Sequence, residues 1–408
     1  MLKKIPAKHL TIGMHLHALC GSWMKSPFWR SKFIVTEQSD ILLILNSGIA
    51  EVWIDVEKGI DMTTIEPEEV VEEQNLVKTV EVAPMPKTRQ PEISKRVSMA
   101  EEMQRAEQIC DSSTSAVKSM FKEARMGKAI SVEAAGEVVE EISASVMRNP
   151  SALINLARLK SADDYTYMHS VAVCALMVAL SRQLHLDEAQ TRQAGLGGLL
   201  HDLGKAVMPT CVLNKPGKLT DQEFAVMKSH PREGHRILQE GGIVGEVPLD
   251  VCLHHHEKID GSGYPFALKG DEISLYAKMA AVCDVYDAIT SNRPYKMGWG
   301  PAESIVKMTE WSKGHFDEHI FQSFVRCIGI YPVGTLVGLS SGRLGVVIEQ
   351  SEKSLLTPKV KVFFSTKRKE YVPPEVIDLS RSGNMDRIAS LENAKKWGIK
   401  KMDHFWAA

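Results

Sequence analysis

The stretch Gly195-Leu-Gly-Gly-Leu-Leu-His-Asp-Leu-Gly-Lys205 decides the fold, because it ends in a histidine followed directly by an aspartate. The apolar residues ahead of His201 predict the end of a buried helix, and Gly204 predicts a turn after it. A carboxylate beside an imidazole can serve two metal ions, with Asp202 bridging them while His201 binds one. Lys205 adds a cation within reach of anything that the metals bind. No β-strand frame surrounds the glycines, so we interpret them as sites of close helix packing rather than as a dinucleotide-binding loop.

Other residues of metal-ligand type lie on both sides of this pair, and the interpretation depends on them because a lone His-Asp dipeptide is common on protein surfaces. They are His169, His230, the run His254-His255-His256, and Asp284. Together they can complete a polynuclear site of imidazoles and carboxylates. We expect His254 to lie at the surface or beside the ligands rather than to bind metal, and His235 to lie beside them.

The strongest short motif is His255-His-Glu-Lys-Ile-Asp-Gly-Ser-Gly-Tyr-Pro265. Its two histidines are expected to end a helix and to point at metal. Asp260, Gly261 and Gly263 then predict a tight turn that lets the backbone approach a ligand closely. Tyr264 offers a ring for stacking on a base and a hydroxyl for a phosphate.

Composition sets limits on the class of protein. The chain has 408 residues, enough for two or three domains, and a net charge of −2, which with no basic stripe predicts no nucleic-acid partner. The most apolar short run, Ile41–Leu45, is far below membrane-spanning length, and no apolar segment follows the lysines of Met1–Pro6, so we expect no membrane contact and no signal peptide. The seven cysteines are scattered without a CxxC pair, which predicts reduced thiols and a cytoplasmic location. Cys252 and Cys283 flank suspected ligands, but their apolar neighbours favour a packing role.

Hydrophobic periodicity divides the chain into five segments. Residues 1–60 are expected to form a small α+β domain, with a strand over Glu51–Val56 and a helix from Ile41. Residues 61–92, rich in glutamate and proline, are expected to be a linker. Residues 93–332 show helical patterns throughout. Residues 333–380 return to strand composition and predict a small β appendage, followed by a C-terminal tail over 381–408.

Two local features of the helical segment lead to further predictions. The box Thr220-Asp-Gln-Glu223 predicts the start of a helix that carries His230. The charged amphipathic helices over 95–150 have two interpretations: they transmit a signal or form a homodimer, or they are the first helices of the catalytic core.

In combination, His201-Asp-x-Gly-Lys205 and His255–Pro265 resemble the HD-GYP phosphodiesterases, a branch of the metal-dependent HD superfamily. Three further stretches match the same family. They are Tyr165-Thr-Tyr-Met-His-Ser170, Lys228-Ser-His-Pro231, and Asp284-Val-Tyr-Asp-Ala-Ile-Thr-Ser-Asn-Arg-Pro-Tyr-Lys296. The resemblance covers roughly 153–331, and the first sixty residues resemble a small unit of unknown function found ahead of this domain. It implies a mainly α protein with an all-helical HD-type core.

The resemblance also implies roles for single residues. The implied metal ligands are His169, His201, Asp202, His230, His255, His256 and Asp284. Asp202 and Lys205 are the implied catalytic residues, and the implied substrate contacts are Lys205, Gly263, Tyr264, Pro265, Arg293 and Lys296. Some relatives hold a third metal through a glutamate before the first histidine. The neighbourhood here is Asp163-Asp164, so we expect two divalent ions, iron or manganese.

The function implied by the family is hydrolysis of cyclic di-GMP to linear pGpG, and in a second cycle to GMP, by attack of a hydroxide that bridges the two metals. Two alternatives stay open. One is a phosphodiesterase that prefers 3′,3′-cyclic GMP-AMP, because the residues that distinguish the two purines lie in loops without an assigned role. The other is a sensor that binds a cyclic dinucleotide without cutting it.

Overall fold

The computed structural model describes residues 2–19, 33–35, 50–60, 97, 99–158, 165–215, 217–242, 245–291, 298–351, 354–381, 384–399 and 405, with single positions between 38 and 45. The chain divides into two compact units, Met1–Ile93 and Ser94–Ala408. The expected linker over 61–92 lies outside the described residues. No helix in the described part of the chain is long and apolar enough to cross a membrane.

The first unit is a four-stranded antiparallel sheet. Its elements are β1 (Leu2–Pro6), the 3₁₀ helix η1 (Ala7–His9), β2 (His15–Leu19), β3 (Phe33–Ile34) and β4 (Glu51–Asp55). The strand order is β1-β4-β2-β3. The predicted strand over Glu51–Val56 is therefore confirmed as β4, with Val52 and Ile54 buried in the core. Most of the predicted helix from Ile41 lies outside the described residues, although Ile41 and Ile44 belong to the same core.

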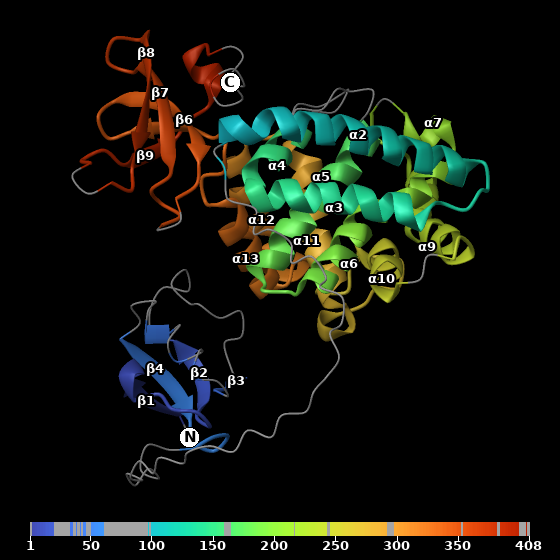
Figure 1. Ribbon diagram of the computed structural model, residues 1–408, viewed down its shortest axis with the longest axis horizontal. Coiled ribbons are helices and arrows are strands. Elements are labelled where there is room, and N and C mark those ends of the chain that lie inside the picture. The colour runs from blue at the N-terminus through green and yellow to red at the C-terminus, as the bar shows by residue number, and fades with distance from the viewer. Residues whose placement is uncertain are drawn as a thin grey trace, which may run out of the picture. The chain divides into compact units, whose positions relative to one another are not determined.

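The second unit is built mainly of helices. They are α2 (Met99–Arg125), α3 (Val132–Arg148), α4 (Pro150–Arg158), α5 (Tyr165–Gln183), α6 (Glu188–Leu200), η4 (Leu203–Val207), α7 (Thr210–Leu213), α8 (Asp221–Met227), α9 (His230–Glu240), α10 (Glu246–His254), η5 (Gly270–Glu272), α11 (Leu275–Thr290), α12 (Pro301–His315) and α13 (Glu318–Ile328). α5 is the central helix, because every residue from His169 to Ser181 is buried. α2 and α3 lie side by side along one face of the bundle (Figure 1). The expected mainly helical core is confirmed.

A five-stranded antiparallel sheet completes this unit. Its strands are β5 (Leu336–Leu339), β6 (Arg343–Glu349), β7 (Lys359–Ser365), β8 (Glu370–Asp378) and β9 (Ile388–Leu391), with η6 (Ala394–Trp397) after them. The order is β8-β7-β6-β5-β9. β9 comes from the segment expected to be a tail, where it pairs with β5. Phe405 stacks on Phe363 of β7 with ring centroids 3.9 Å apart, so this residue also packs on the sheet.

Two local predictions in the helical unit have different outcomes. The capping box is present, because Thr220 Oγ1 accepts a hydrogen bond from the Glu223 amide at 3.3 Å and Glu223 Oε2 accepts one from the Thr220 amide at 2.7 Å. The expectation that this helix carries His230 is wrong. α8 ends at Met227 and His230 opens α9, since Pro231 fits the first turn of a helix but cannot continue one from the preceding turn.

Glycines let the site helices approach closely, as the sequence predicted. A Cβ on Gly198 of α6 would lie 2.9 Å from Met177 Cγ and 3.1 Å from the Cys174 amide of α5. A Cβ on Gly204 would collide with the carbonyl oxygen of His230 at the start of α9. These contacts bring the residues around Asp202 against α5 and α9.

Candidate metal centre

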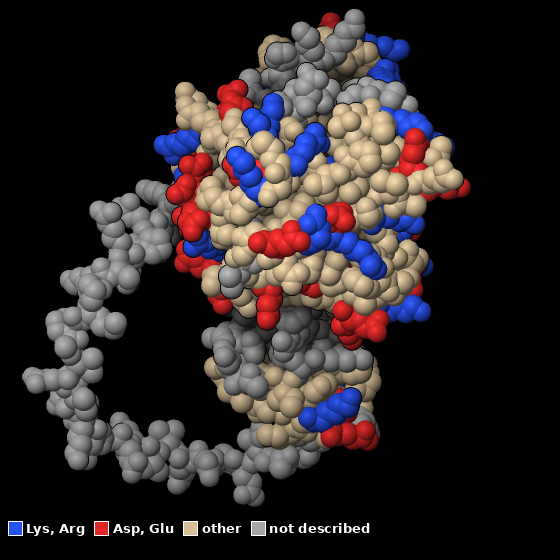
Figure 2. All heavy atoms as spheres, turned by 90° about the vertical axis from the view of Figure 1, so that its right-hand side faces the viewer, with Lys and Arg blue, Asp and Glu red and all other residues tan. Residues whose placement is uncertain are grey.

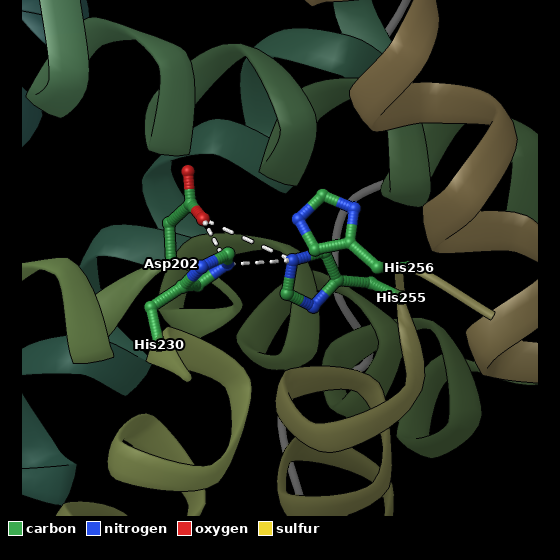
Figure 3. A group of neighbouring side chains, drawn as sticks. All are labelled: Asp202, His230, His255 and His256. Atoms are coloured by element: carbon green, nitrogen blue, oxygen red, sulfur yellow. Dashed lines mark hydrogen bonds and ion pairs between the residues drawn. The ribbon is translucent and has the colours of Figure 1, made fainter. Parts of the chain in front are cut away.

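The seven expected ligands come together in two neighbouring groups. Within each group the candidate ligand atoms lie within 4.8 Å of one another. The first group is His169, His201 and Asp284, and the second is Asp202, His230, His255 and His256. The residues come from five helices or helix ends, namely α5, α6, α9, α10 and α11. Figure 3 shows the second group, with Asp202 and the three imidazoles converging on one space.

Asp202 lies between the two groups. Its Oδ2 is 3.5 Å from His169 Nε2 and 3.4 Å from His201 Nε2. Its Oδ1 is 3.2 Å from His230 Nε2 and 3.8 Å from His255 Nε2. The two oxygens of one carboxylate thus face different ligand groups, which is the arrangement that a bridging ligand needs.

Backbone carbonyls orient three of the imidazoles. His201 Nδ1 lies 2.8 Å from the Gly198 carbonyl oxygen, and His230 Nδ1 lies 2.8 Å from that of Met227. His255 Nδ1 lies 3.0 Å from the carbonyl oxygen of Cys252. A carbonyl only accepts, so each Nδ1 carries the proton and each Nε2 is left with a lone pair directed into the site. All three contacts form within the turn that precedes the histidine.

A carboxylate outside the expected ligand set orients His169. Asp287 Oδ2 lies 2.6 Å from His169 Nδ1, while His169 Nε2 lies 3.0 Å from Asp284 Oδ1. Burial opposes protonation of His169, but the two carboxylates outweigh it and raise its pKa. Asp287 was not among the residues expected from the sequence to act in the site. The available signal was its spacing of three residues from Asp284, which puts both carboxylates on one face of α11.

The electrostatics of the cluster favours a bound cation. Burial opposes ionisation of Asp202, yet Lys205 and the neighbouring imidazoles hold its pKa well below the ordinary value. Burial lowers the pKa of His256 to about 3 and that of His255 well below its usual range, so both rings are neutral at neutral pH. His201 Nε2 and Asp202 Oδ1 are buried, and no described residue forms a hydrogen bond with either atom. Lone pairs left without a donor at this depth fit divalent metal ions.

The buried thiols near the site belong to neither ligand group. Burial raises the pKa of both Cys252 and Cys283, so the thiols stay protonated. Cys252 Sγ donates to the His201 carbonyl oxygen at 3.3 Å. The donor set is therefore imidazole nitrogen and carboxylate oxygen.

The loop after α10 presents a tyrosine to the metal ligands. The Tyr264 ring stacks on His256, with centroids 4.6 Å apart. Burial raises the pKa of Tyr264, so its hydroxyl remains a hydrogen-bond donor. Buried Glu257, which the sequence analysis left without a role, accepts hydrogen bonds from the amides of Phe266 at 2.7 Å and Leu268 at 3.1 Å. It thereby fixes the shape of the loop.

The other residues expected at the site lie in the loop, beside the ligand groups, or outside the described residues. A Cβ on Gly263 would collide with the backbone of Lys258, so Gly263 shapes the loop, and the Pro265 carbonyl accepts from Arg232 Nη2 at 3.3 Å. His254 Nδ1 lies 2.8 Å from Asp250, and neither it nor the partly buried His235 joins a ligand group. Arg293, Lys296 and Asp163-Asp164 lie outside the described residues.

Comparisons with known proteins agree with this geometry. The model for a domain of unknown function, DUF3391, matches residues 2–135, and the model for the HD domain matches residues 142–320. The cyclic di-GMP phosphodiesterase PA4108 of Pseudomonas aeruginosa is 52% identical over 407 residues, which cover 100% of this chain and 96% of that protein. The cyclic di-GMP phosphodiesterase response regulator RpfG of Xanthomonas campestris is 42% identical over 35% of this chain and 39% of its own length. The 3′3′-cGAMP-specific phosphodiesterase 1 of Vibrio cholerae is 34% identical over 46% of this chain and 42% of its own length.

A helical core that joins histidines and aspartates from several helices in a buried cluster defines a metal-dependent phosphohydrolase of the HD type. Within that class, the chain belongs to the HD-GYP family of phosphodiesterases, preceded by a DUF3391 domain.

Proposed function

We propose that this protein hydrolyses cyclic di-GMP to linear pGpG at two divalent metal ions bridged by Asp202. The observation that carries the proposal is the position of the Asp202 carboxylate, whose two oxygens face the two ligand groups. In this assignment His169, His201 and Asp284 would hold one ion, and His230, His255 and His256 would hold the other. Iron and manganese suit this donor set, because it contains five imidazoles, two carboxylates and no thiolate.

Divalent ions bound here would neutralise charge on the phosphodiester and lower the pKa of a water molecule enough for it to act as the nucleophile. The residues of the chain position the ligands and the substrate. Asp287 and the backbone carbonyls fix the imidazole rings, so the ligands need little rearrangement when metal binds. Lys205 Nζ, held by a hydrogen bond to Asp202 Oδ2, places a positive charge beside the phosphate. Tyr264 covers His256 and offers its hydroxyl as a donor.

Two relatives support the choice of substrate, because PA4108 and RpfG are both named as cyclic di-GMP phosphodiesterases. A second candidate is 3′,3′-cyclic GMP-AMP, the substrate named for the less similar Vibrio relative. Both dinucleotides carry the same two phosphodiesters, so the metal centre does not distinguish them. Hydrogen bonds to one purine edge must do so.

The complete set of seven ligands favours an enzyme over a sensor, because a protein that only binds the dinucleotide does not need all seven. Four further expectations stay predictions. They are the contacts of Arg293 and Lys296 with phosphate, a second cycle that yields GMP, the lack of a nucleic-acid partner, and the cytoplasmic location. A homodimer through 95–150 also stays a prediction. The apolar side chains of α2 and α3 are buried within their own unit, so such a dimer would use the polar faces of these helices.

The test is to measure kcat/KM for the two dinucleotides side by side, with protein loaded with iron or with manganese, and to identify the products by chromatography. We expect cyclic di-GMP to be the better substrate and linear pGpG to be the first product. A clear preference for the mixed dinucleotide would change the substrate and leave the site assignment intact. Metal-loaded protein that cuts neither would place the chain among the sensors.

A further inference from the structure

A pocket of about 610 Å³ opens beside the metal centre, between the second half of α2, the first turn of α5, η4 and α7. Its walls include Lys118, Phe121, Lys122 and Arg125 of α2, Tyr167 of α5 and Lys205 of η4. Its volume falls in the range of sites that bind small molecules. Figure 2 views the helical unit from the side where the end of α2 and α7 lie in Figure 1, and lysine and arginine side chains gather in the upper part of this face.

The charge of the pocket is positive. Four of the residues that line it are lysine or arginine and none is acidic. Lys118, Lys122 and Arg125 follow one another at spacings of four and three residues, so they lie on one face of α2. No acidic side chain in the described part of the chain pairs with Lys122, which is exposed. This face of α2 therefore favours an anionic ligand.

The pocket adjoins the metal centre at Lys205. Lys205 lines the pocket, and its Nζ donates to Oδ2 of Asp202. Tyr167 of α5 also lines the pocket, and its ring packs on Phe121 of α2 on a different side of the helix from His169. A phosphodiester at the metal ligands would therefore have Lys205 between it and the basic wall of α2.

Contacts with the core hold α2 in this position. Arg125 Nε donates to the Ala206 carbonyl oxygen at 2.8 Å, which joins the end of α2 to η4. The Phe121 ring meets the Tyr167 ring edge to face at 5.4 Å, and Lys118 Nζ lies 5.8 Å from the centre of that ring. The lysines thus belong to a helix that is held against η4 at its end and against α5 by the Phe121–Tyr167 contact.

We propose that this pocket binds the half of the cyclic dinucleotide that is remote from the metal ions, with the second phosphodiester paired with Lys118 and Lys122. The inference rests on the proposed function, since a cyclic dinucleotide carries two anionic phosphodiesters and only one of them can be at the metal centre. α2 lies outside residues 142–320, which match the HD domain, and inside residues 2–135, which match the domain of unknown function. The segment assigned to that domain therefore supplies one wall of the substrate site.

The test compares two substrates in the full-length protein. Cyclic di-GMP has a second phosphodiester, whereas bis(4-nitrophenyl) phosphate has one phosphodiester and nothing to reach α2. The variant is Lys122→Glu, and the matched control is Lys128→Glu, an exposed lysine beyond the end of α2 that does not line the pocket. Both substitutions change the net charge equally.

We expect Lys122→Glu to raise KM for cyclic di-GMP about tenfold, with kcat changed by less than about twofold, because the lysine binds the substrate without touching the reacting phosphate. Turnover of bis(4-nitrophenyl) phosphate should stay within about twofold of wild type, and Lys128→Glu should change neither substrate. An unchanged KM, or an equal loss for both substrates, would overturn the pocket assignment. A failure of the proposed function is visible separately, because wild-type protein would then cut bis(4-nitrophenyl) phosphate and neither dinucleotide, and both proposals would fall.

Discussion

Asp202 is buried, and its two oxygens face different ligand groups. An amide in its place presents one oxygen and cannot bridge two cations. We therefore expect Asp202→Asn to lower bound metal and to reduce turnover about a thousandfold or more, as expected for the loss of several kcal/mol of transition-state stabilisation. Metal analysis and turnover of cyclic di-GMP check this. Normal values of both would remove Asp202 from the ligand set.

Asp287 acts on the site through His169. Replacing it by asparagine keeps the shape of the side chain but removes the charge that holds Nδ1–H, so we expect metal affinity to fall about 10- to 100-fold, with recovery of activity in excess metal. The matched control is Asp250→Asn, because Asp250 holds His254 outside the ligand groups. Titration of metal into chelator-treated protein measures both variants. Equal affinities in the two would show that Asp287 has no positioning role.

At the scale of single residues, the sequence predicts the metal ligands better than the residues that orient those ligands. All seven expected ligands converge, because each belongs to a short motif that is visible in the sequence. Asp287 and Glu257 were left without a role since a charged residue on a helix or in a loop is usually exposed. Only the packing of α11 on α5, and of the loop on itself, gives these carboxylates their buried partners.

The glycine between Asp202 and Lys205 sets how closely η4 and α9 approach. A Cβ on Gly204 would meet the backbone of His230, which cannot move without moving a ligand. We expect Gly204→Ala to lower the free energy of unfolding by about 1–3 kcal/mol and to reduce bound metal. Gly300→Ala is the control, since a Cβ there has only Glu303 Oε2 nearby, at 4.0 Å. Urea unfolding of both variants measures the difference, and similar midpoints would contradict the close-packing account.

The boundaries and faces of the helices show which structural features short sequence patterns can predict. The capping box at Thr220 was predictable because it is local, whereas the break between α8 and α9 was missed although Pro231 signals it. For α2, the amphipathic pattern left two interpretations open, and the helix buries its apolar side chains in the core of its own unit. The pattern could not tell whether the lysines of the other face meet solvent, a second chain or a substrate pocket, because that depends on helices far away in the sequence.

The division of the whole chain into two units predicts where it can be cut. All seven ligands and α2 belong to the second unit, so a chain that starts near Ser94 should fold and keep hydrolysis. A chain that starts at residue 136, just past the DUF3391 match, should be insoluble, because α2 buries Ala106, Val117 and Phe121 in the core. Expression, metal content and turnover of the two truncated chains test this. A soluble, active shorter chain would show that α2 is dispensable.

The sequence predicts the order of the segments along the chain more readily than their pairing. A helical centre between two small β-containing parts is visible in the periodicity. The strand β9 was not, since it pairs with β5 across about fifty residues and has no turn signal beside it that specifies the partner.

The central claim is that Asp202 bridges two metal ions at which a cyclic dinucleotide is cut. Anomalous diffraction from crystals of the metal-loaded protein, measured at the iron and manganese edges, tests it most directly. We predict two peaks, one among His169, His201 and Asp284 and one among His230, His255 and His256, with the Asp202 carboxylate between them. A single peak, a third peak of equal height, or two peaks without Asp202 between them would contradict this account.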